Sequence, residues 1–182
     1  MRTFTKSFLL FVVVCSSLLG CKKDEEVAPK NSFSYNGKDF DLSKVIMIDY
    51  GLAGPGLGYN IDLLLLPTGI TVNELAGNIG TTTGKGDFLY FEIFSAVKDV
   101  LADGEYIFDP KETFKGNTFD YATAVFNADY TTNTGEQVEV TTGKLNVKKE
   151  GNVYILSFDC EISGGKKLTG FYKGPIKYYS EK

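Results

Sequence analysis

The chain has 182 residues, with 19 Lys and Arg against 23 Asp and Glu, which gives a formal net charge of −4. This length predicts one domain or at most two, and the acidic balance lacks the basic surface that nucleic-acid binding requires. The sequence contains no histidine, which excludes Ser-His-Asp and Cys-His catalysis, histidine metal sites and a histidine pH switch.

The first twenty residues have the pattern of a secretory signal peptide. Arg2 and Lys6 form a basic start, residues 8–14 are an unbroken apolar run, and small residues follow. The apolar run is shorter than the roughly 20 residues that a membrane-spanning helix needs. We therefore expect residues 1–20 to be removed on export.

Leu18-Leu19-Gly20-Cys21 resembles the bacterial lipobox. The resemblance implies that Cys21 receives a thioether-linked diacylglycerol and becomes the first residue of the mature protein. Two or three acyl chains on one cysteine make a stable membrane anchor, because each buried CH₂ contributes about 0.8 kcal/mol. The alternative is an ordinary signal peptide with a chance cysteine at this position.

A charged segment follows the lipobox cysteine, and Lys23-Asp24-Glu25 is similar to the export signal of Bacteroidota lipoproteins. That signal directs lipoproteins to the outer leaflet of the outer membrane, so the resemblance implies a domain that faces the cell exterior. A periplasmic domain, with these residues serving only as a solvated tether, is the alternative. We expect residues 21–32 to form the lipidated N-terminus and tether, and residues 33–182 a single β domain.

The pattern after the tether predicts an all-β fold, a single antiparallel β-sandwich or barrel-like domain. Short β-rich runs are separated by turn residues, and Asn36-Gly37 is a strong hairpin signal. The second half of residues 59–66, and residues 88–94, are apolar on both faces, which requires a covering layer on each side. At most one short helix is expected, at Thr71–Gly77, where Thr71 and Glu74 have capping-box spacing.

The C-terminal half predicts an up-and-down meander of four strands, because sequential strands usually pair. The expected strands are residues 119–130, 137–148, 152–162 and 167–179. Gly170 and Gly174 in the last strand are expected to make room for large aromatic side chains on the neighbouring strand.

The strand-and-turn order of the domain resembles a set of Bacteroidota lipoproteins with a poorly characterised all-β domain. The segments that carry this resemblance are residues 104–108, 143–147, 154–158 and 168–174. The family supplies no known catalytic residues to carry over.

Cys160 is the one cysteine left when Cys15 is removed with the signal peptide and Cys21 is acylated. It is either a reactive thiol or a buried thiol that packs as a small hydrophobe. The alternation of residues 154–162 places Cys160 in an apolar stripe, which favours the buried thiol.

Two features are weak candidates for ligand binding. The loop at residues 51–58 leads into a strand and not into a helix, so it is no phosphate cradle; it is expected to be a flexible connection, with a mobile binding loop as the alternative. A similar glycine-rich segment at residues 80–86 lacks the full P-loop pattern and is expected to be a flexible connection. Aromatic residues on the outward face of the last strand are candidates for stacking on sugars, although packing in the core or against a second sheet is the favoured explanation. The candidate residues are Gly51, Gly54, Gly56, Gly58, Phe171 and Tyr179.

The best acidic cluster contains Asp103, Glu105, Asp109 and Glu112. Oxygen ligands suit Ca²⁺, so Asp103, Glu105 and Asp109 are a weak calcium candidate, but the full calcium-loop pattern is absent. A carboxylate pair for glycoside hydrolysis and a solvated turn are the alternatives, and the turn is the simplest.

These patterns predict a monomeric, non-enzymatic binding or accessory lipoprotein that uses no cofactor. We expect the protein to be anchored in the membrane through Cys21. We expect its ligand to be an extracellular glycan, a peptide or a component of a membrane complex. A lipocalin-like barrel with a small apolar ligand in an interior cavity is the alternative. An enzyme ranks third, because no motif places a nucleophile beside a base.

The lipidation of Cys21 gives a direct test. Intact mass measurement of protein extracted from membranes is expected to show two or three acyl chains on residue 21, and Cys21→Ala is expected to leave the signal peptide uncut. A soluble, unacylated mature protein would contradict the prediction.

Overall fold

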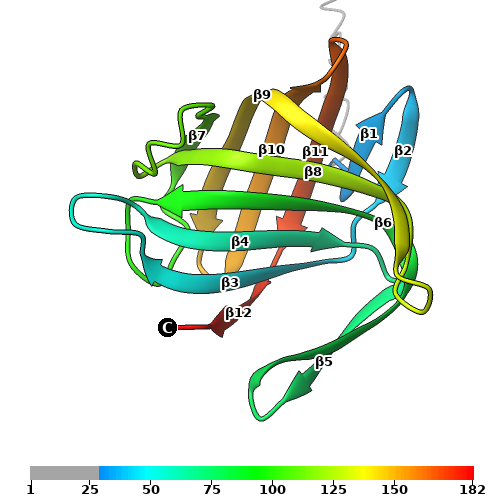
Figure 1. The fold of residues 1–182 in the computed structure, drawn as a ribbon, viewed down its shortest axis with the longest axis horizontal. Coiled ribbons are helices and arrows are strands. Elements are labelled where there is room, and N and C mark those ends of the chain that lie inside the picture. The colour runs from blue at the N-terminus through cyan, green and yellow to red at the C-terminus, as the bar shows by residue number, and fades with distance from the viewer. Residues whose placement is uncertain (1–28) are drawn as a thin grey trace, which may run out of the picture.

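The computed structural model describes residues 29–182, which form one strongly curled β-sheet (Figure 1). The predictions on residues 1–20, Cys21 and Lys23-Asp24-Glu25 lie outside the described residues. The all-β prediction is confirmed. The strands are β1 Ser32–Tyr35, β2 Lys38–Asp41, β3 Lys44–Leu52, β4 Tyr59–Leu66, β5 Ile70–Leu75, β6 Asn78–Ser95, β7 Gly104–Phe108, β8 Thr118–Asp129, β9 Thr134–Glu150, β10 Val153–Ile162, β11 Lys166–Gly174 and β12 Ile176–Ser180.

The C-terminal meander is confirmed, because β8 pairs antiparallel with β9, β9 with β10 and β10 with β11. The last expected strand, however, is divided at Pro175. β11 pairs with β10 and β1, whereas β12 pairs in parallel with β3. Only Pro175 separates β11 from β12, so the two ends of the strand order β12-β3-β4-β6-β8-β7-β9-β10-β11-β1-β2 are brought together as the sheet curls.

The inner face of the curl carries the main hydrophobic core. Phe91 packs edge-on against Phe119 and Phe158, with both pairs of ring centroids 5.6 Å apart. Leu63 and Leu89 on the front strands and Leu156 on the back strands are fully buried in the same cluster. Side chains from both layers therefore fill the interior of the curl.

A smaller cluster lies on the outer face, where the β5–β6 hairpin covers part of the sheet. Ile46, Leu66, Ile70 and Tyr179 are its buried members. The expected layer on both faces is present near the hairpin, where Leu66 and Phe88 face this cluster while Leu63 and Leu89 face the inner core. Farther along β4 and β6 the outer-face residues Asp62, Tyr90 and Glu92 are only half-buried, so the expectation is wrong for that part.

The predicted helix at Thr71–Gly77 is wrong, because these residues form β5 and a hairpin turn. Ile70 and the β-branched Val72 gain apolar burial against the outer cluster, which overrides the capping-box spacing. Glu74 does not cap a helix but pairs with Lys177 at 2.9 Å. Ala76 and Gly77 both have positive φ, as a tight hairpin turn requires.

The glycine-rich segment at residues 80–86 is not a flexible connection but part of β6. At Gly84 φ is +99°, and a Cβ atom would collide with the carbonyl oxygen of Gly69. The prediction for Gly170 is confirmed, because the ring of Phe158 on neighbouring β10 occupies the space that a side chain would fill. At Gly174 the aromatic neighbour is Tyr172 of the same strand.

Cys160 is fully buried in the inner core, as its alternation predicts. Burial raises the pKa of its thiol to about 12, which keeps the thiol protonated and unreactive at neutral pH. Residues 29–182 contain no helix of the length and apolarity needed to cross a membrane.

The buried carboxylate of Asp49 ties β3 to the C-terminal segment. Its Oδ1 accepts a hydrogen bond from the Gly51 backbone N at 2.8 Å, and its Oδ2 lies 2.8 Å from Lys182 Nζ and 3.3 Å from the Tyr178 hydroxyl. Asp49 itself is 0% exposed, so Lys182 is the cation that compensates a fully buried negative charge.

Replacing Lys182 with Met keeps the alkyl chain but removes the charge that compensates Asp49. We expect Lys182→Met to lower the free energy of unfolding by about 1–3 kcal/mol, the cost of an unpaired buried polar group, measured by urea denaturation. Lys30→Met is the control, since Lys30 pairs with Asp41 at 2.6 Å with both side chains exposed, and it is expected to have almost no effect. Equal effects of the two substitutions would contradict this account.

Candidate functional site

The β1–β2 hairpin lies near one end of β8 and β9 (Figure 1). Residues of this hairpin line a groove together with residues of β8, β9 and the start of β11. Two cavities of about 530 and 400 Å³ share Tyr35, Glu136 and Lys166 in their linings. A third cavity of about 260 Å³ also contains Tyr35 and Lys166. We call this continuous surface, centred on Tyr35, Glu136 and Lys166, the hairpin groove.

Stacked aromatic rings form the floor of the hairpin groove. Tyr35 stacks on Phe126 with ring centroids 5.0 Å apart, and Phe40 lies 5.1 Å from the same ring. Phe33 stacks on Phe40 at 4.8 Å and continues the floor into the inner core. Phe33 and Phe126 are buried, whereas Tyr35 and Phe40 are half-buried and line the groove.

Irregular backbone shapes one side of the groove. The β6–β8 register shifts between Gly86 and Phe88, and the β8–β9 register shifts between Phe126 and Asp129. Asn127 has a φ of +52°, and its backbone N–H donates to Asp87 Oδ1 at 2.8 Å. Such bulges commonly reorient side chains at binding sites and at the rims of curled sheets.

The rim of the groove carries polar side chains without protein partners. Within residues 29–182, the side chains of Lys38, Glu136, Gln137 and Lys166 take part in no hydrogen bond or ion pair. Lys166 Nζ lies 6.0 Å from the centroid of the Tyr35 ring. Two ammonium donors, a carboxylate acceptor and an amide with both functions therefore surround an aromatic floor.

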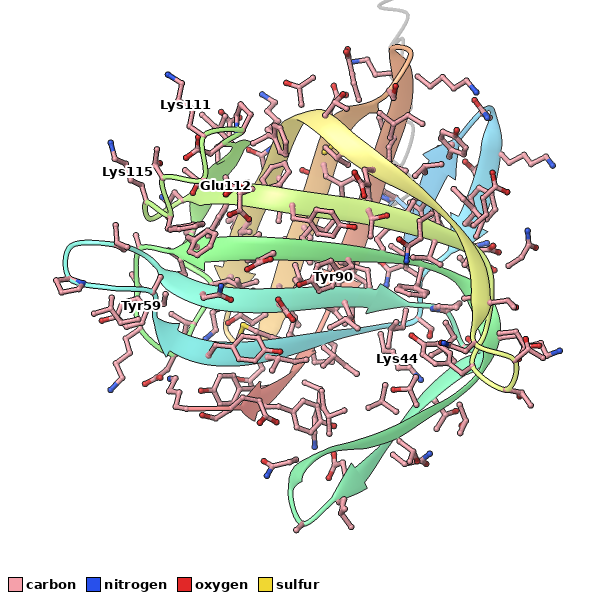
Figure 2. All side chains as sticks on the ribbon, in the orientation of Figure 1. Lys44, Tyr59, Tyr90, Lys111, Glu112 and Lys115 are labelled. Carbon is pink, nitrogen blue, oxygen red and sulfur yellow. The ribbon has the colours of Figure 1, made fainter. Side chains whose placement is uncertain are left out.

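A second polar cluster lies on the outer face of β3, β4 and β6, and Figure 2 shows Tyr90 at the centre of this face. The hydroxyl groups of Tyr90 and Tyr50 donate to the two oxygens of Asp62, at 2.6 and 3.1 Å. Burial raises the pKa values of Asp62 and Tyr90, and it raises the pKa of Tyr50 to about 12. Both phenols therefore stay protonated and act as hydrogen-bond donors.

Two carboxylates continue this outer cluster. Glu92 accepts a hydrogen bond from Asn60 Nδ2 at 2.9 Å, and Asp120 has a buried Oδ1 with no hydrogen-bond partner. Burial, followed by repulsion from Glu92, raises the pKa of Asp120 to about 6. A carboxyl group with a raised pKa beside a second carboxylate is a pattern of glycosidase acids, but neither residue lines the cavities of the hairpin groove.

The loop at residues 51–58 connects β3 to β4 and lies at the end of these strands that is opposite the hairpin groove (Figure 1). Gly51 and Gly56 have φ values of +89° and +78°, and Gly54 accepts a turn hydrogen bond from Leu57 N. Gly58 has no room for a side chain beside Phe94. Turn geometry and close packing thus account for the glycines, and backbone hydrogen bonds join Ala53 to Gly58 and Gly58 to Phe114.

The structure does not bring Phe171 and Tyr179 together as an exposed platform. Phe171 is half-buried on β11, opposite Ser157. Tyr179 lies on the outer face of β12, but the β5–β6 hairpin covers it, so it is only 4% exposed. Its hydroxyl donates to Glu74 at 2.9 Å, which gives it a structural role.

The carboxylates of the calcium candidate have separate partners. Asp103 accepts a hydrogen bond from the Lys149 backbone N–H, and Glu105 pairs with Lys144 at 2.9 Å. Asp109 accepts hydrogen bonds from the Thr113 hydroxyl and from the backbone N–H groups of Thr113 and Lys111. These hydrogen bonds, that of the Thr113 hydroxyl above all, lower the pKa of Asp109. The part of the chain that the structure describes contains no group of three His, Cys, Asp or Glu residues placed to hold a metal ion.

The hairpin groove is not predicted by any pattern in the sequence. Its central residues Tyr35, Glu136 and Lys166 come from three strands that are distant in sequence and form no motif. The local signal was the Asn36-Gly37 turn, which places Tyr35 at the end of a hairpin but does not show what packs against it.

Comparisons of the chain with family models, curated proteins and solved structures find no match. The function is therefore argued from the sites themselves.

The raised pKa of Asp120 predicts a pH-dependent stability. Its folded pKa of about 6 lies above its ordinary value of 3.8, so the folded state disfavours the charged form. This penalty is present above pH 6 and disappears as the pH falls towards 4. We expect Asp120→Asn to raise the thermal midpoint at pH 7.5 and to have little effect at pH 4.

Glu181→Gln is the matched control, because it removes the same charge from an exposed position. It is expected to leave the thermal midpoint unchanged at both pH values. An Asp120→Asn variant that is less stable than the wild type at pH 7.5 would show that the carboxylate is satisfied in the fold.

Proposed function

We propose that this chain is a lipid-anchored lipoprotein of the outer membrane that faces the cell exterior and binds a ligand without chemical turnover. The proposed location rests on the similarity of Leu18-Leu19-Gly20-Cys21 to a lipobox and of Lys23-Asp24-Glu25 to a surface-export signal. At about 3.3–3.6 Å per residue, residues 22–32 can extend about 35–40 Å, which is enough to hold the domain clear of the lipid.

The hairpin groove is the observation that carries the binding role. Exposed lysines elsewhere, such as Lys98 and Lys111, also form no ion pair within residues 29–182, so an unpaired lysine does not by itself mark a site. Lys38 and Lys166 differ because they line the same cavity as the partly exposed rings of Tyr35 and Phe40. Unpaired polar groups around an apolar floor are typical of ligand sites.

The chemistry of the side chains supports binding without catalysis. The thiol of Cys160 is buried with a pKa of about 12, and Tyr50 and Tyr90 remain protonated donors to Asp62. The groove itself offers lysines, a glutamate and amides, but no nucleophile hydrogen-bonded to a base.

A lipocalin-like carrier is the second candidate and requires an empty interior. The rings of Phe91, Phe119 and Phe158 pack against one another in the centre of the curl. This packing favours a ligand on the outside of the curl, in the hairpin groove, over an apolar ligand within it.

Protease treatment of intact cells tests the location. We expect proteinase K to digest the domain on intact cells, with a periplasmic protein as the control that stays protected until the outer membrane is permeabilised. Full protection of the domain on intact cells would place it on the periplasmic side and would contradict the surface assignment.

Binding and turnover are separated by incubating the mature lipoprotein with immobilised glycans, peptides and membrane proteins of the same organism. We expect retention of one ligand class and unchanged ligand mass after prolonged incubation. Cleavage of any glycoside or ester that is lost on Glu92→Gln or Asp120→Asn would instead identify an enzyme.

A further inference from the structure

We propose that the hairpin groove binds a neutral carbohydrate, with Tyr35 as the ring on which a sugar packs. This inference rests on the proposed binding function and names the ligand class for the same site. It follows from the placement of one aromatic ring, from the unpaired polar groups around it and from the charge balance of the groove.

Tyr35 is held in a fixed orientation before any ligand arrives. One face of its ring stacks on Phe126 at 5.0 Å with an interplanar angle of 25°, and Phe126 packs in turn against Phe33 and Phe40. Tyr35 is half-buried and lines all three cavities of the groove, and the ammonium group of the exposed Lys166 lies 6.0 Å from its ring centroid. A rigid aromatic face beneath a movable lysine suits the C–H face of a sugar ring, and fixing the ring in advance reduces the entropy lost on binding.

The polar rim matches hydroxyl groups, which both donate and accept hydrogen bonds. Lys38 and Lys166 supply donors, Glu136 supplies acceptors and Gln137 supplies both. None of these four side chains is engaged by another residue in the part of the chain that the structure describes. A sugar that lies on Tyr35 is therefore surrounded by hydrogen-bonding groups that the fold leaves free.

Charge balance argues for a neutral ligand. The groove contains three lysines, Lys38, Lys166 and Lys167, and three carboxylates, those of Asp87, Glu136 and Glu139. An anionic ligand would meet these carboxylates, and a strongly basic peptide would meet the lysines, so a neutral polyhydroxylated molecule fits best. The adjoining cavities of about 530 and 400 Å³ lie within the range of small-molecule sites, and together they suit an oligosaccharide longer than one sugar.

The test uses the mature lipoprotein in detergent micelles and a panel of neutral gluco-, manno- and xylo-oligosaccharides, with uronic-acid oligosaccharides and basic peptides for comparison. We expect isothermal titration calorimetry to detect at least one neutral oligosaccharide. Tyr35→Ala is expected to weaken that binding about tenfold, the effect of losing an aromatic contact. Gln137→Ala and Lys166→Ala are expected to weaken it severalfold, and these surface changes keep the test valid if Tyr35→Ala fails to fold.

Matched controls lie at the opposite end of the sheet. Tyr50→Ala removes a tyrosine that is 46% exposed, and Lys98→Ala removes an exposed lysine; both are expected to leave binding unchanged. Binding that is equally strong in the Tyr35, Gln137 and Lys166 variants would overturn the assignment of the groove.

The remaining outcomes separate this inference from the proposed function. If only peptides or uronic-acid oligosaccharides bind, the neutral-carbohydrate inference is overturned while a binding lipoprotein stands. If no class binds, the inference and the binding function are both overturned. If an oligosaccharide is cleaved, the ligand class is retained but the non-enzymatic function is overturned.

Discussion

The curl of the sheet depends on the passage of one chain segment from β11 to β12 through Pro175. β11 is bonded to β10 and β1, and β12 is bonded in parallel to β3. Proline has no N–H to donate and a fixed φ, so it interrupts the ladder at the point where the segment changes partners. The Tyr172 hydroxyl donates to the Pro175 carbonyl at 2.8 Å and holds this corner. Because a single residue separates the two strands, β3 must lie close to β11, and the sheet encloses its inner face.

Enclosure on one side leaves the outer face of β3, β4 and β6 to be covered separately. The β5–β6 hairpin covers one end, where Leu66 and Tyr179 are buried. Within residues 29–182 no strand covers the other end, which carries polar groups such as Asp62 and Tyr90 in place of apolar ones. Strands with apolar residues on both faces are thus compatible with a sandwich and with a curled sheet. For this reason the sequence does not distinguish the two architectures.

Local chemistry was predictable where one short segment determines the outcome. Asn36 and Gly37 both adopt positive φ in the β1–β2 turn, Cys160 occupies its apolar stripe, and Gly170 accommodates the ring of Phe158. Predictions failed where a distant partner decides, as at Thr71–Gly77, where burial against the outer cluster selects a strand. Tyr179 is outward as predicted, yet the hairpin that buries it lies about a hundred residues earlier in the chain, as its hydrogen bond to Glu74 shows.

The hairpin groove was not predictable for the same reason, and its position follows from the shortness of β1 and β2. Each has four residues, and β1 covers only four of the nine residues of β11. The hairpin therefore covers only part of the aromatic end of the core, and Tyr35 and Phe40 remain half-exposed there.

The direction of this hairpin also relates the groove to the proposed anchor. Ser32, where the chain enters β1, lies at the opposite end of the hairpin from the Asn36-Gly37 turn that borders the groove. At about 3.3 Å per residue, the turn extends about 13 Å beyond the point of entry. If the chain is tethered through Cys21, the element that links the domain to the membrane carries the groove at its far end. A short strand pair then sets the position of the binding surface, while the inner core and the Pro175 crossing maintain the fold.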